Sequence, residues 1–246
     1  MTTTTLNNLT QQIQENQWNN TILKLDGRGE PLLHPQITNL VSLIKRNNPK
    51  NILTLTTNGD YISQQLFQEL FDMGLNVLFI DCYDSLFTRK NTIATWTKQT
   101  KHPTIKVHDF YEDNFNLYHD KFNTDEQQVV LIDDIVKNNN KREDRTLLNH
   151  AGNIIPENFE KQGISFNLPK TNPCNKPHRE LTIRYDGTIS FCCEDASNII
   201  PLGNINKNHI QEIWKYNHTL NKIRQELQQG NREKIIPCSQ CSYIGT

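Results

Sequence analysis

The sequence predicts an α/β fold built on a parallel sheet, followed by a small cysteine-rich α+β domain. Strand-like and helix-like segments alternate over the first half of the chain, with strand starts roughly 25 to 30 residues apart, as in βα units. The segment LNVLFID, residues 75–81, is apolar on both faces, which is typical of buried parallel strands. Five of the six cysteines lie beyond residue 173. A parallel sheet or (β/α) barrel is therefore favoured over an all-α or all-β fold.

Hydrophobic periodicity places the individual elements of the first part. Ile37, Leu40, Val41 and Ile44 recur at helical spacing, and Gly74 is a suitable residue to follow the end of a helix. We expect helices over residues 6–13, 37–44, 62–73 and 86–98, and strands over residues 21–26, 51–56, 75–81, 104–109 and 129–133.

The second part differs in pattern. The polar run NNNKRED and Gly- and Pro-punctuated sequence predict a linker over residues 137–175. Beyond it, ELTIR and TISFC flank the dipeptide Asp186-Gly187, which predicts a β-hairpin. A polar helix is expected over residues 208–227. We predict a barrel-like domain over residues 1–165 and a second domain over residues 166–246.

Composition excludes several classes of function. The formal net charge of the 246 residues is -1, so no strong field favours nucleic acid or an anionic membrane as a partner. No apolar run approaches the roughly 18 residues of a membrane-spanning helix, and the N-terminus has no apolar signal segment. We expect a cytoplasmic protein, in which clustered cysteines indicate metal or redox chemistry rather than disulfides.

Four cysteines have the spacing of a metal centre. Cys174 is followed after twelve residues by Gly187 and after four more by Cys192, and Cys238 and Cys241 form a C-x2-C pair. The hairpin would return Cys192 toward Cys174, and the terminal loop would add the other pair. Four thiolates satisfy either a [4Fe–4S] cluster or a tetrahedral zinc ion, and the spacing leaves both open.

This pattern resembles the C-terminal extension of radical S-adenosylmethionine (SAM) enzymes, called SPASM, or "twitch" in its shorter, one-cluster form. The stretches CNKPHRELTIRYDGTISFCCED, LGNINKNHIQEIW and PCSQC carry the resemblance, and the shorter form fits because no further cysteines follow. The resemblance implies that Cys174, Cys192, Cys238 and Cys241 ligate one auxiliary [4Fe–4S] cluster. Cys193 would be the spare member of its pair, although an exchange with Cys192 stays open.

The N-terminal part resembles the same superfamily. The stretch DGRGEP, residues 26–31, is similar to the GGEP motif, and residues 57–59 are similar to its TNG motif. The resemblance implies that Gly27, Gly29 and Glu30 border SAM, a second expected cofactor. Arg28 departs from the motif, and the stretch also fits a plain strand-to-helix turn with Pro31 near the first helical position.

The C-x3-C-x2-C loop that holds the SAM-reducing cluster in radical SAM enzymes is missing, because no cysteine precedes Cys82. We therefore predict a partial (β/α) TIM-like barrel that lacks its first strand. Three explanations stay open: a truncated sequence, a split enzyme in which a second polypeptide supplies the loop, or a protein that has lost radical chemistry. Cys82 itself is predicted to be a buried or partly buried thiol.

The resemblance implies radical SAM oxidation or modification of a small molecule or a peptide, provided that the missing loop is supplied. Whether this chain is itself an enzyme is left undecided by the sequence. One alternative is a non-catalytic iron–sulfur accessory or electron-transfer subunit, and the other is a zinc-stabilised binding module.

Overall fold

The computed structural model describes residues 1–27, 29–82, 86–99, 105–109, 122, 124–133 and 168–243. Contacts divide the chain into two compact units. The first groups residues 1–12 with the described C-terminal residues, and the second holds the described residues from 13 to 133. The predicted linker lies mostly outside the described residues, and the predicted boundary at residue 165 stays a prediction.

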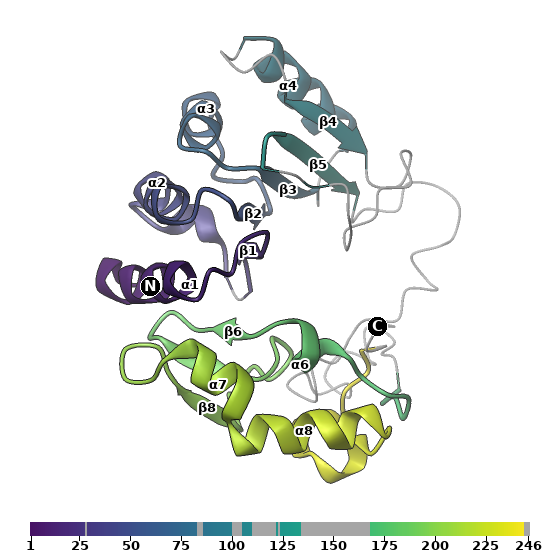
Figure 1. Ribbon diagram of the computed structural model, residues 1–246. Coiled ribbons are helices and arrows are strands. Elements are labelled where there is room, and N and C mark those ends of the chain that lie inside the picture. Colours follow the sequence, from purple (N-terminus) through teal and green to yellow (C-terminus); the bar gives the residue numbers. More distant parts are fainter. Residues whose placement is uncertain are drawn as a thin grey trace. The chain divides into compact units, whose positions relative to one another are not determined.

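A five-stranded parallel sheet forms the second unit (Figure 1). Its strand order is β1-β2-β3-β5-β4, so that β5 lies between β3 and β4 instead of following them in sequence order. The strands are β1 (Ile22–Leu25), β2 (Ile52–Thr57), β3 (Val77–Cys82), β4 (Lys106–Asp109) and β5 (Gln128–Asp133). All five predicted strands and the predicted parallel pairing are present.

Strand β3 lies at the centre of this sheet. Leu78 pairs with Leu55 of β2 on one side and with Val129 of β5 on the other. Leu78 and Ile80 are fully buried, which confirms the apolar pattern predicted for residues 75–81. A strand that is covered on both faces and paired on both edges fixes the register of its neighbours.

The helices of the second unit follow the predicted order. They are η1 (Pro31–Leu33), α2 (Ile37–Asn47), α3 (Gln64–Asp72) and α4 (Leu86–Gln99), and α2 and α3 run along one face of the sheet (Figure 1). Helix α3 is capped by Ser63, whose hydroxyl accepts a 3.1 Å hydrogen bond from the Leu66 amide. Gly74 ends it at a φ of 99°, as predicted for the residue after a helix.

The first unit contains a three-stranded antiparallel sheet of β6 (Thr182–Ile183), β7 (Thr188–Ser190) and β8 (Pro201–Asn204). Strands β6 and β7 form the predicted hairpin. At its turn, the Asp186 carboxylate accepts a 3.0 Å hydrogen bond from the Thr188 amide, and Gly187 adopts a φ of 85°. A Cβ at Gly187 would lie 2.6 Å from the Asn206 side chain, so conformation and space both require glycine.

Short helices complete this unit: α6 (Lys176–Arg179), α7 (Ile210–Tyr216), α8 (His218–Gln228), η2 (Arg232–Lys234) and α9 (Ile236–Ser239). The prediction of one helix over residues 208–227 is wrong, because the chain leaves helical geometry at Asn217, with a ψ of 116°. The Asn217 side chain accepts a 2.9 Å hydrogen bond from the Leu220 amide and so begins α8. Asparagine competes for backbone hydrogen bonds, which favours this break.

Helix α1 (Thr3–Glu15) contributes its residues 3–12 to the same unit as the C-terminal residues. The Gln12 side chain donates to the Ile205 carbonyl at 3.1 Å and accepts from the Ile210 amide at 2.7 Å. Asn206 adds bonds to Thr5 and Asn8. These bonds join segments almost 200 residues apart, and no sequence pattern predicted them.

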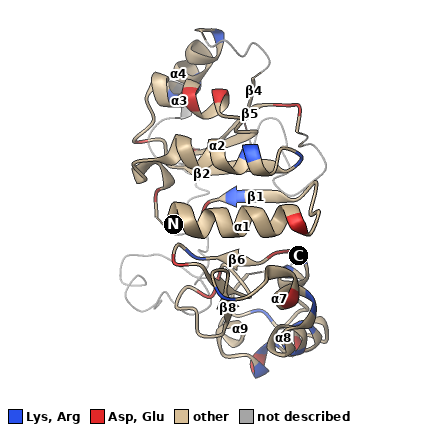
Figure 2. Cartoon of the chain, turned by 60° about the vertical axis from the view of Figure 1, so that its left-hand side comes forward, with Lys and Arg blue, Asp and Glu red and all other residues tan. Residues whose placement is uncertain are grey.

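Residues of both charge signs are interspersed along the elements coloured in Figure 2. This agrees with the near-zero net charge, and the absence of a nucleic-acid partner stays a prediction. Among the described residues, no helix combines the length and apolar character required to cross a bilayer.

Candidate functional site

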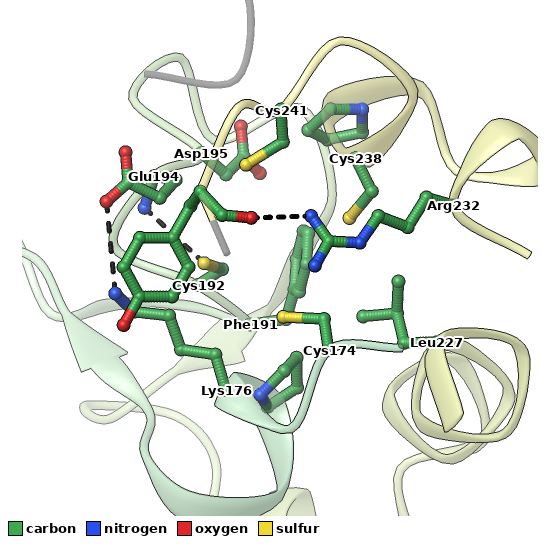
Figure 3. Close-up of a pocket in the computed structure, with 13 residues that line it drawn as sticks. Cys174, Lys176, Phe191, Cys192, Glu194, Asp195, Leu227, Arg232, Cys238 and Cys241 are labelled. Carbon is green, nitrogen blue, oxygen red and sulfur yellow. Dashed lines mark hydrogen bonds and ion pairs between the residues drawn. The ribbon is translucent and has the colours of Figure 1, made fainter. Parts of the chain in front are cut away.

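The first unit contains a pocket lined by four cysteine side chains. Cys174, Cys192, Cys238 and Cys241 come from three separate segments of the chain, and all four line the same pocket. Figure 3 shows their sulfur atoms directed toward this common space. The structure therefore brings together the four cysteines that the sequence singled out. A set of four thiols is a donor set that fits an iron–sulfur cluster.

Each cysteine segment is fixed by local structure. Cys174 precedes α6, and its amide donates a 3.1 Å hydrogen bond to the Leu227 carbonyl at the end of α8. Cys192 follows β7 at the end of the hairpin. Cys238 lies in α9, and the Cys241 amide donates to its carbonyl at 3.1 Å, which closes a tight turn. Both thiols of the C-x2-C pair thereby reach the same pocket.

The two adjacent cysteines differ in position. Cys192 lines the pocket, and its sulfur accepts a 3.4 Å hydrogen bond from the Glu194 amide. The Cys193 sulfur lies outside this lining and within 3.9 Å of carboxylate oxygens of Glu180 and Glu194. The geometry therefore supports Cys192 over Cys193 as the fourth donor.

Burial controls the protonation of the C-x2-C pair. It raises the pKa of Cys238 to about 12, with further upward contributions from the charges of Cys241 and Cys174 and an opposing one from Arg232. Burial also raises the pKa of Cys241. A metal ion reverses this preference, because a coordinating thiol is deprotonated outright. Metal binding at this pocket would therefore release protons.

Lys176 lies at the edge of the pocket between acidic and aromatic groups. Its ammonium group is 3.6 Å from Glu180, 3.8 Å from Glu194 and 4.0 Å from the centre of the Tyr243 ring. Burial acts to lower the pKa of Lys176, but the negative charges of Cys193, Glu180 and Cys192 outweigh it and raise the pKa. The lysine therefore stays charged beside the thiols.

Arg232 lies on the wall of the same pocket with 2% of its surface exposed. Neither Arg232 nor Lys176 was singled out from the sequence. Arg232 lies in the stretch NREK, and Lys176 lies in the stretch CNKPH. Charged or polar stretches of this kind predict surface positions. Only the tertiary fold places them beside the cysteines.

A separate constellation lies at the carboxyl ends of β1 and β2 in the second unit. The Glu30 carboxylate accepts hydrogen bonds from the Leu32 amide at 2.8 Å, the Thr57 hydroxyl at 2.7 Å and the Asn58 amide at 2.9 Å. The two stretches that resemble GGEP and TNG are thus bonded to each other through one carboxylate. Thr57 also accepts from the Gly59 amide at 3.0 Å, which fixes the second stretch.

The glycines of this constellation adopt conformations that other residues avoid. Gly27 has a φ of 130° and Gly29 a φ of 92°. Among the described residues, a Cβ at either position would meet no atom within 4 Å, so conformation and not crowding favours glycine here. The open space leaves the backbone accessible to a ligand. Arg28 lies outside the described residues.

Cys82 takes no part in either constellation. It is fully buried at the end of β3, and its sulfur lies 3.6 Å from the Ile80 carbonyl oxygen. The prediction of a buried thiol is confirmed.

Residues 174–242 match the SPASM family, described as an iron–sulfur cluster-binding domain. The match begins at the first cysteine of the pocket and ends just after the last. A curated relative, the S-adenosyl-L-methionine-dependent 2-deoxy-scyllo-inosamine dehydrogenase of Niallia circulans, is 23% identical over 220 residues, which are 88% of this chain and 70% of the relative. The cysteine-rich C-terminal part of this chain is therefore similar to SPASM domains, and most of the chain is similar to an S-adenosyl-L-methionine-dependent dehydrogenase.

Two solved structures of proteins with bound AdoMet share the fold of this chain. The crystal structure of BtrN in complex with AdoMet and 2-DOIA superimposes with a TM-score of 0.67 at 20% identity, covering 99% of this chain and 81% of that one. The structure of anSMEcpe with bound AdoMet and the Kp18Cys peptide gives 0.52 at 14% identity, covering 98% and 81%. The predicted α/β fold of the radical SAM type and the resemblance to SPASM proteins are both confirmed.

Proposed function

We propose that this chain is an iron–sulfur protein of the radical SAM/SPASM type that holds one auxiliary [4Fe–4S] cluster through Cys174, Cys192, Cys238 and Cys241. The observation that carries the proposal is the pocket itself, in which four thiols from three segments face one space. The bound cluster supplies one-electron chemistry. The protein supplies the four thiolates, a hydrogen bond from the Glu194 amide to Cys192, and the cations of Lys176 and Arg232.

The choice of a cluster over a single zinc ion is supported by the family match. Four thiolates satisfy either centre, but residues 174–242, which contain all four cysteines, match a domain described as iron–sulfur cluster-binding.

SAM is the second cofactor that we propose, and its amino-acid part would lie at the edge formed by Gly27, Gly29 and Glu30. The dependence of the curated relative on S-adenosyl-L-methionine supports this assignment. The exposed glycine backbone can approach a ligand, and the Glu30 carboxylate holds that backbone against the TNG stretch. Hydrogen abstraction from a substrate would follow only where a C-x3-C-x2-C loop is supplied.

A small-molecule alcohol is the substrate class to test first, because the curated relative is named as a dehydrogenase of 2-deoxy-scyllo-inosamine. A peptide substrate is the second class. Turnover with either would require a C-x3-C-x2-C loop, supplied by a longer form of this chain or by a second polypeptide.

Anaerobic reconstitution with iron and sulfide tests the cluster. We expect about four irons per chain, the broad absorbance of a [4Fe–4S] cluster, and no 5′-deoxyadenosine after addition of dithionite and SAM. One zinc per chain without iron-dependent absorbance would overturn the proposal in favour of the zinc module.

A chimera tests the catalytic part separately. In it, a C-x3-C-x2-C segment from a radical SAM enzyme precedes this chain. We expect about eight irons and reductive formation of 5′-deoxyadenosine. A chimera that binds eight irons and SAM but forms no 5′-deoxyadenosine would indicate an accessory electron-transfer subunit.

A further inference from the structure

Asp195 is a buried carboxylate in the wall of the cysteine pocket. It is 2% exposed and lies shortly after Cys192, in the connection between β7 and β8 (Figure 3). A buried carboxylate is costly unless hydrogen bonds compensate it, and negative charge beside it adds to the cost. Metal-bound thiolates in this pocket would supply such charge, so the position of Asp195 calls for an explanation.

Both oxygens of this carboxylate hold backbone amides. Oδ1 accepts a 2.9 Å hydrogen bond from the Ile199 amide, and Oδ2 accepts a 3.2 Å bond from the Ile200 amide. Ile200 directly precedes β8. Because the acceptor is a carboxylate, such bonds are stronger than those between neutral groups. The side chain therefore ties the middle of the β7–β8 connection to its end.

The same residue closes the turn that begins at Cys192. The Asp195 amide donates a 3.3 Å hydrogen bond to the Cys192 carbonyl, which also accepts a 3.3 Å bond from the Ser190 hydroxyl. Cys193 and Glu194 occupy the two central positions of this turn, and the Glu194 amide donates to the Cys192 sulfur. This turn places Cys192 in the lining of the pocket and leaves Cys193 outside it.

We infer that Asp195 is a positioning residue for the cluster site: its carboxylate fixes the β7–β8 connection so that Cys192, and not Cys193, faces the pocket. This inference rests on the proposed function, since it treats Cys192 as a cluster ligand. The carboxylate acts through backbone amides and is not assigned as a ligand. It gives a physical reason for the choice between two adjacent cysteines, which their spacing in the sequence leaves open.

The test compares Asp195→Asn, which keeps one acceptor oxygen, with Asp195→Ala, which keeps none. Asn217→Ala is the matched control, because it removes two hydrogen bonds from the same compact unit at a position outside the pocket lining. Each full-length variant is reconstituted anaerobically with iron and sulfide. The loss of cluster absorbance to an iron chelator is then followed with time, and circular dichroism in urea measures the stability of each variant.

We expect Asp195→Asn to lose its cluster about tenfold faster than the parent, because residues that orient metal ligands change metal affinity by at least about that factor. Asp195→Ala should lose its cluster faster still. Asn217→Ala should lose its cluster at the parental rate although it is less stable. Parental rates in both Asp195 variants, or an equal acceleration in Asn217→Ala, would overturn the inference.

Alkylation of the metal-free proteins tests the positioning without a cluster, and it decides the case in which an Asp195 variant binds no iron. In the parent, Cys192 is 9% exposed. Asp195→Asn should raise the rate of iodoacetamide modification at Cys192 relative to the rate at Cys193. An unchanged ratio of these two rates, or an equal rise in Asn217→Ala, would overturn the inference. Absence of iron in the reconstituted parent would instead contradict the proposed function, and the alkylation ratio would still decide the role of Asp195.

Discussion

The Thr57 hydroxyl donates a 2.7 Å hydrogen bond to Oε1 of Glu30, across 27 residues of sequence. The bond joins the end of β2 to the glycine-rich turn after β1, and the Asn58 amide adds a second bond to the other oxygen of the same carboxylate. Two short stretches that were each compatible with an ordinary turn are therefore parts of one hydrogen-bonded unit. The parallel pairing of β1 and β2 places them at the same edge of the sheet, and the shared carboxylate bonds them to each other.

Replacement of Thr57 by Val should destabilise this unit. Thr57 is 2% exposed, and the substitution keeps its shape while removing the donor to a charged carboxylate. We expect a loss of about 1.5 to 3 kcal/mol in the free energy of unfolding, measured by urea denaturation. Thr57→Ser keeps the hydroxyl and should lose only about 1 kcal/mol. Equal losses in both variants would contradict the importance of the bond.

Cys192 and Cys193 should differ in cluster assembly. Because only Cys192 lines the pocket, Cys192→Ala should reduce bound iron after anaerobic reconstitution to well below four per chain. Cys193→Ala should bind as much iron as the parent. The measurement is the iron count together with the absorbance spectrum, and the opposite pattern would identify Cys193 as the ligand.

Alkylation of the metal-free protein should depend on pH in a different way at each cysteine. The hydrogen bond from Cys192 and the charge of Lys176 lower the pKa of Cys193, whereas burial raises the pKa of Cys238 to about 12. Because the thiolate is the nucleophile, Cys193 should have the highest alkylation rate near pH 7.5, and its rate should stop rising at a lower pH than that of the other cysteines. The alkylation rate of Cys238 should still be rising at pH 10.

Mass spectrometry of iodoacetamide-treated protein measures these rates residue by residue. Fully buried Cys82 serves as the internal control that stays unmodified while the fold is intact. Equal rates at Cys193 and Cys238 near pH 7.5 would contradict the electrostatic assignment.

Replacement of Asn217 by Ala should destabilise the C-terminal unit. The substitution removes the cap of α8, a 2.9 Å bond to the Leu220 amide, and a 3.1 Å bond to the Leu202 carbonyl. We expect a loss of about 1 to 2 kcal/mol in the free energy of unfolding, followed by circular dichroism in urea. Exposed Lys222 in the same helix offers the control, and Lys222→Ala should change stability by less than about 0.5 kcal/mol.

The sequence predicted features whose signals are local. The Asp186-Gly187 turn, the C-x2-C pair and the apolar run of β3 each lie within a few residues, and each appears in the structure as expected. The break at Asn217 was missed because apolar residues on both sides keep helical spacing, so that only the side-chain cap marks the end.

Features that depend on distant contacts were not predicted. Arg232 lies in the charged stretch NREK, and only its bonds to carbonyls 59, 60 and 11 residues away reveal that it is buried. Strand β5 lies between β3 and β4. This position is likewise set by its pairing with β3, roughly 50 residues earlier in the sequence. Periodicity contains no information about such partners.

The bonds of Gln12 to Ile205 and Ile210 make the C-terminal unit discontinuous along the chain. The sheet of the other unit is encoded between its two parts, in the manner of an inserted domain. During synthesis on a ribosome, all five parallel strands emerge before Cys174, so the sheet can form while the first helix still lacks its partners. The cysteine pocket can form only after the turn that carries Cys238 and Cys241 has emerged.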